Sequence, residues 1–108
     1  MKIDEIFNKF INYQLSIGNT DKTIKSYKSH INQFIYYMNN SNMYKVNYND
    51  YENYIIYLRQ KKIESVTIHS YAVSLKAFFH WAYNNDYLKE NIYSKIKLPR
   101  YNKKTIEI

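Results

Sequence analysis

The side chains best suited to chemistry in this sequence are cationic and hydrogen-bonding groups that recur at helical spacing. His69, Lys76 and His80 are seven and eleven residues apart, which is close to whole helical turns, and Ser70 lies at the margin of this set. A second set between residues 21 and 38 comprises Lys22, Lys25, Ser26, Ser29 and Gln33. Such side chains bind phosphates and the edges of bases. The alternative interpretation is a solvated helix surface that binds nothing.

Each polar set lies opposite an apolar stripe, so both segments are predicted to be amphipathic helices. Residues 65–83 carry a stripe of Ile68, Tyr71, Leu75, Phe78, Phe79 and Ala82, and residues 21–38 one of Ile24, Tyr27, Ile31, Phe34, Ile35 and Met38. The hydroxyl of Ser65 is expected to cap the first of these helices, and Asn19 or Thr20 the second.

Two further helices are predicted over residues 3–17, where Gly18 ends the pattern, and over residues 49–61. A short helix around residues 88–96 is compatible with the pattern. The predicted fold class is therefore all-α, with one helical domain over residues 1–91. Residues 92–108 are predicted to be a basic linker, because the segment has one acidic residue, Glu107, and five basic ones: Lys95, Lys97, Arg100, Lys103 and Lys104.

Composition excludes several classes of function. The chain has no cysteine, which rules out disulfides and thiolate metal sites, and its single glycine rules out glycine-rich phosphate loops. The three histidines, His30, His69 and His80, lack metal-ligand spacing, and no catalytic grouping stands out, so neither a cofactor nor catalysis is predicted. No apolar run reaches the roughly 20 residues that are needed to span a bilayer. We therefore expect a cytoplasmic location and no membrane partner. The net charge of +7 favours a polyanion such as nucleic acid.

A set of short motifs in a fixed order adds a family resemblance. The chain reads TIKSY at residues 23–27, YLRQKK at 57–62, SVTI at 65–68, LKAFF at 75–79 and NDYLKEN at 85–91. Together they resemble the N-terminal core-binding, or SAM-like, domain of tyrosine recombinases and phage-type integrases. The resemblance extends from about Phe7 to Lys104.

The resemblance implies a four-helix orthogonal bundle whose second and fourth helices approach the DNA core site, followed by a basic linker to a separate catalytic domain. The implied DNA contacts are Lys22, Lys25, Ser26, Ser29 and Gln33, then His69, Ser70, Lys76 and His80, with Arg100, Lys103 and Lys104 along the backbone. Two positions depart from the family pattern: Asn91-Ile92 replaces the usual Asn-Pro, and no arginine stands near Ser70.

The implied function is that of a DNA-binding module for integration or recombination. The catalytic domain is absent from this sequence, so the chain itself is not expected to be an enzyme, whereas its parent would cut and rejoin DNA. The implied partner is double-stranded DNA; the isolated domain is expected to be monomeric, and the parent tetrameric on DNA. Two alternatives stay open: a helical protein-interaction module, and a stand-alone DNA-binding regulator.

Overall fold

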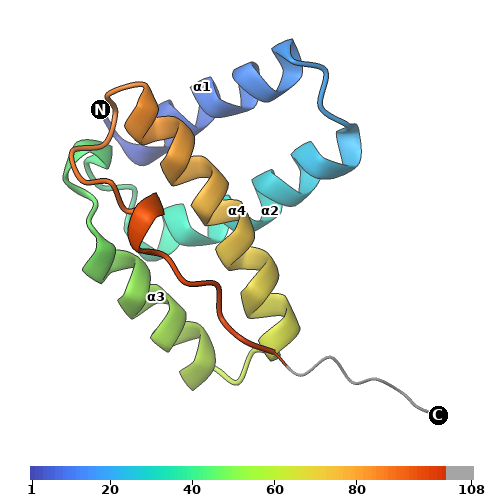
Figure 1. Cartoon of the computed structure of the whole chain (residues 1–108), viewed down its shortest axis with the longest axis vertical. Helices are drawn as coiled ribbons and strands as arrows, with labels where there is room; N and C mark the ends of the chain where they lie inside the picture. The colour runs from blue at the N-terminus through green and yellow to red at the C-terminus, as the bar shows by residue number, and fades with distance from the viewer. Residues whose placement is uncertain (102–108) are drawn as a thin grey trace.

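The computed structural model describes residues 1–101, and these form a helical bundle (Figure 1). Its four helices are α1 (Ile3–Ser16), α2 (Asp21–Tyr37), α3 (Tyr48–Gln60) and α4 (Ser65–Asn84). Two 3₁₀ turns, η1 (Met43–Lys45) and η2 (Tyr93–Lys95), follow α2 and α4 respectively. The four predicted helices and the all-α class are confirmed. The weak helical pattern of residues 88–96 yields only the single turn η2.

Helix α4 is the central element, because it packs against all three other helices. In Figure 1 it passes in front of α2 and crosses it steeply. Its predicted apolar stripe is confirmed: all members are buried except Tyr71, which is half-buried and packs against the core. One continuous row of apolar side chains can thus serve three neighbours, which is why the longest helix organises the bundle.

Aromatic rings fill much of the core where the helices meet. Phe7 and Phe78 join α1 to α4 with ring centroids 5.7 Å apart in an edge-to-face arrangement. Phe34 of α2 makes the same kind of contact with Phe79 of α4 at 5.7 Å and with Tyr54 of α3 at 5.2 Å. These distances lie in the favourable range for aromatic pairs, so Phe34 links three helices at one point.

The helix ends follow local chemistry in most places. Gly18 adopts a φ of 76°, which few other residues tolerate, and the Thr20 hydroxyl accepts a hydrogen bond from the Thr23 amide at the start of α2. The predicted cap at Ser65 is wrong. The Ile68 amide already bonds to the Glu64 carbonyl at 3.0 Å, so Ser65 is the first residue inside α4 and no side chain caps this helix.

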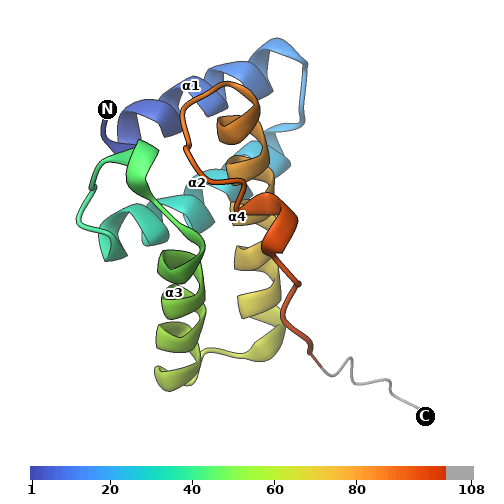
Figure 2. The ribbon, with the colours of Figure 1, turned by 60° about the vertical axis from the view of Figure 1, so that its left-hand side comes forward.

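The segment after α4 turns back and runs along that helix, as both ribbon views show (Figures 1 and 2). Ile92 and Ile96 are buried in the core, although sequence analysis assigned both to a linker. Glu90 fixes the start of the segment: its carboxylate accepts the Tyr48 amide at 3.0 Å and pairs with Lys95 at 3.2 Å. The packed unit therefore includes residues of the expected linker.

Candidate nucleic-acid interface

Helix α2 presents its predicted polar face to solvent. Lys22, Lys25, Ser26, Ser29 and Gln33 are all exposed. Within residues 1–101 one ion pair is present, between Lys95 and Glu90, so neither Lys22 nor Lys25 is neutralised by a carboxylate. Two free ammonium groups three residues apart on one helix are a suitable contact for an anionic backbone.

The contact between α2 and α4 that borders this face is made by two residues that sequence analysis did not assign to the site. His30 Nδ1 lies 2.7 Å from Ser74 Oγ, and the His30 ring lies 4.7 Å from the Tyr71 ring. Burial lowers the pKa of His30 below its usual 6.5, which favours the neutral ring at physiological pH. The available signal was the position of His30 between the apolar stripe and the polar face of its helix.

The polar surface of α2 continues onto α4 at this junction, which we define as Ser26, His30, Gln33, Ser70, Ser74 and Ala77. Ser26 and Gln33 lie four residues before and three after His30, and Ser70 and Ala77 are spaced in the same way around Ser74. Residues at these spacings are neighbours on a helix surface. The predicted Ser26 and Gln33 of α2 and the predicted Ser70 of α4 thus each lie about one helical turn from the contact between His30 and Ser74. Val73, also exposed, lies beside them on α4.

The other three predicted residues of α4 face a different neighbour, the returning C-terminal segment. The His80 ring stacks on the Tyr93 ring at 3.9 Å and 14°, and Lys76 Nζ lies 5.2 Å from the centre of the same ring. His69 Nδ1 lies 2.9 Å from the Pro99 carbonyl oxygen. These three side chains are therefore engaged within the chain and do not join the α2 face.

The remaining predicted contacts belong to the C-terminal segment itself. Arg100 is exposed and lies between Pro99 and Tyr101, both of which contact His69. Lys103 and Lys104 lie outside the described residues. Residues 1–101 contain no group of three histidine, cysteine, aspartate or glutamate side chains arranged to hold a metal ion. In the same range, no helix has the length and apolarity that crossing a bilayer requires.

Comparison with known families identifies this arrangement. The family model described as the phage integrase SAM-like domain matches residues 4–98, which include α2, α3, α4, η2 and all of α1 except its first residue. The chain belongs to the phage integrase SAM-like domain family. The searches of curated proteins and of solved structures found no match. The SAM-like match confirms the family resemblance and the four-helix fold, and it relates the domain to tyrosine recombinases.

Proposed function

We propose that this SAM-like domain grips double-stranded DNA as one module of a site-specific tyrosine recombinase. The observation that carries the proposal is the pair of uncompensated lysines, Lys22 and Lys25, beside the α2–α4 junction. Lysines that neutralise phosphates supply most of the affinity for DNA, and they do so without regard to sequence. Cutting and rejoining of DNA belongs in this proposal to a separate catalytic domain of the parent protein.

The junction supplies the second part of the proposed contact. Ser26, Ser29 and Gln33 from α2, with Ser70 from α4, bring hydroxyl and amide groups that can bond to base edges in the major groove. Ser70 already donates to the Val66 carbonyl at 3.2 Å, so its hydroxyl offers mainly acceptor capacity to DNA. Modest base discrimination is the result expected from so few free donors.

The C-terminal segment contributes a second basic edge in this proposal. Lys76 Nζ lies over the Tyr93 ring, and Arg100 is exposed. Together with His69 and His80, and with Lys103 and Lys104 further along, they would follow the DNA backbone as the chain leaves the bundle.

A protein-interaction module is the second candidate function. The observation that favours it is the apolar end of α1, where Leu15 and Ile17 are 58% and 56% exposed. Such side chains bind other proteins more readily than they bind DNA. The two functions make opposite predictions for charge reversal on α2.

Lys25→Glu tests the DNA-binding proposal. The variant should bind duplex DNA more weakly, whatever the DNA sequence, because it loses a phosphate contact and adds a repulsive charge. Loss of the contact should also reduce the slope of log K against log salt by about 1. Binding is measured by fluorescence anisotropy with a labelled duplex at two salt concentrations.

Lys9→Glu is the matched control, since it makes the same charge change on the exposed surface of α1. Both variants should melt at the temperature of the unmodified domain. If the two variants weaken DNA binding equally, the effect comes from net charge alone, and α2 is not part of the interface. Loss of a protein partner with unchanged DNA binding would support the second candidate.

A further inference from the structure

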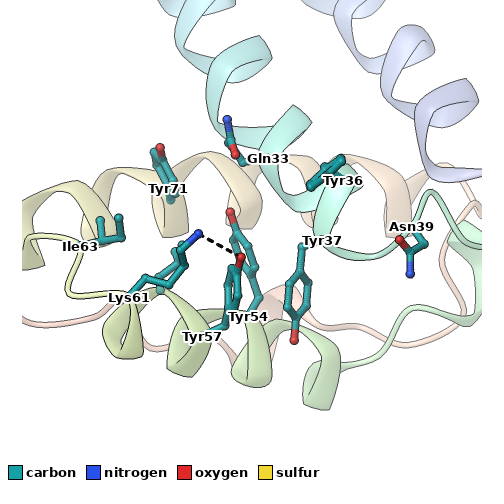
Figure 3. A pocket seen from close by; sticks show the side chains of 10 residues that line it. Gln33, Tyr36, Tyr37, Asn39, Tyr54, Tyr57, Lys61, Ile63 and Tyr71 are labelled. Atoms are coloured by element: carbon teal, nitrogen blue, oxygen red, sulfur yellow. Dashed lines mark hydrogen bonds between the residues drawn. The ribbon is translucent and has the colours of Figure 1, made fainter.

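A cavity of about 370 Å³ opens between the C-terminal halves of α2 and α3 and the beginning of α4 (Figure 3). Ligand sites in proteins commonly have volumes of this order. Five tyrosines contribute to its lining: Tyr36, Tyr37, Tyr54, Tyr57 and Tyr71. We call it the tyrosine pocket. Gln33, a member of the α2–α4 junction, lies at its border, so the pocket adjoins the proposed DNA-binding surface.

The walls of the tyrosine pocket are flat aromatic surfaces. The Tyr37 ring lies 5.0 Å from Tyr54 and 4.9 Å from Tyr57, and the Tyr54 and Tyr57 rings are 6.3 Å apart at 25°. Tyr57 is 38% exposed, so part of its ring is free for a further contact. A planar, unsaturated ligand is the kind that such a set of rings accommodates.

One polar group of the pocket is buried without a partner. Tyr54 is 1% exposed, and its hydroxyl makes no hydrogen bond within residues 1–101. Figure 3 shows this hydroxyl pointing toward Gln33 on the opposite wall. Burial, followed by the neighbouring Tyr71, raises the pKa of Tyr54, so the hydroxyl stays protonated and available as a donor. The Tyr51 hydroxyl of the same helix is also buried without a partner, and what distinguishes Tyr54 is its place in the lining of the pocket.

The charge of the pocket is positive. Lys61 Nζ lies 3.3 Å from the Tyr57 hydroxyl and 5.2 Å from the centre of its ring. None of the lining residues is acidic. The pocket therefore suits a ligand that combines a planar ring, hydrogen-bonding edges and a negative charge.

We propose that the tyrosine pocket binds one unstacked nucleobase of DNA, stacked on the exposed part of the Tyr57 ring with an adjoining phosphate near Lys61. The inference rests on the proposed function, because Gln33 places the pocket at the end of the α2 face. Stacking on aromatic rings beside a cation is how proteins hold unpaired bases. The edge of a base has acceptors for the Tyr54 hydroxyl. A phenylalanine side chain of a protein partner has none.

Two DNA hairpins with the same stem test the proposal, one fully paired and one with a single extra base. With 2-aminopurine as that base, quenching of its fluorescence reports stacking directly. The domain should bind the bulged hairpin about tenfold more tightly than the paired one, since stacking of one base is worth roughly 1–3 kcal/mol. Tyr57→Ala should abolish this preference and leave binding of the paired hairpin unchanged.

Tyr54→Phe and Tyr51→Phe form a matched pair. Both tyrosines lie on α3 with a buried hydroxyl that lacks a partner, but only Tyr54 lines the pocket. Both changes should raise the melting temperature, because each removes an unsatisfied group. Only Tyr54→Phe should reduce the preference for the bulged hairpin.

Each outcome decides between the proposals. Equal affinity for the two hairpins would overturn the nucleobase pocket and leave DNA binding by α2 intact; it is also the result expected if a protein side chain occupies the pocket. Failure to bind either hairpin at low salt would overturn the proposed function itself. A preference that survives Tyr57→Ala would place the unpaired base elsewhere.

Discussion

At the scale of single residues, His30 is a titratable group whose chemistry the fold alters at the junction of α2 and α4. It contacts Ser74 through Nδ1 and lies against the Tyr71 ring, and burial lowers its pKa. A histidine held neutral in the folded state makes stability depend on pH, because the unfolded chain binds the proton more readily. The junction between α2 and α4 therefore contains a titrating contact.

Acidification should destabilise the domain through His30. The folded pKa lies below 6.5, so the stabilisation is complete above the unfolded value of about 6.5 and is lost as pH falls toward the folded value. The melting temperature should decline between pH 7.5 and 5.5, and His30→Gln should make this decline shallower. His80→Gln, which changes an exposed histidine, serves as the control. An unchanged pH profile in His30→Gln would contradict the assignment.

At the scale of elements, α3 depends strongly on its first turn. Asn47 accepts the Asp50 amide at 3.0 Å and Asp50 accepts the Asn47 amide at 3.0 Å, which satisfies two amides reciprocally. Glu90 accepts the Tyr48 amide from the segment after α4. The start of α3 is thus held both by its own sequence and by a distant part of the chain.

Removal of the cap should weaken the whole bundle. Asn47→Ala should lower the free energy of unfolding by about 1 kcal/mol, the usual cost of a lost N-terminal cap. Asn53→Ala, at an exposed position inside the same helix, should cause no loss because alanine favours helix. Urea denaturation of the two variants measures the difference, and equal stabilities would argue against the cap.

The C-terminal segment behaves in this structure as part of the packed domain. Ile92 is fully buried, whereas Leu98, six residues later, is 36% exposed. Ile92→Ala should destabilise the domain by about 2–5 kcal/mol, as for other buried aliphatic truncations, and Leu98→Ala by much less. Denaturation curves test this. If Ile92→Ala leaves the stability unchanged, the chain from residue 92 onward is the linker that the sequence pattern predicted.

At the scale of the whole molecule, the net charge of +7 sets the expected behaviour with DNA. If about five phosphates are neutralised, log K should fall with log salt at a slope of roughly −4 to −5. Titrations of one duplex at several salt concentrations measure it. A slope near zero would show that the lysines do not contact phosphates.

Much of the fold could be predicted because helical periodicity is local. The apolar stripe of α4, the left-handed Gly18 and the Thr20 cap follow from neighbouring residues alone. The prediction that Ser65 caps α4 was wrong for a local reason as well. The helix begins at Ser65, one residue earlier than the pattern predicted, so Ser65 lies inside it. The exposed face of α2 was predicted correctly as a surface, and its binding role stays a prediction.

The sequence by itself determined which side of each helix is apolar, and with it the four-helix class and the family. Only the tertiary structure decided what covers the other sides. It joined His30 to Ser74, laid the C-terminal segment over His69, Lys76 and His80, and left the Tyr54 hydroxyl in a pocket. The physical reason is that periodicity records burial along one helix, whereas these contacts join residues 13 to 44 positions apart in the chain, where no local pattern specifies the partner.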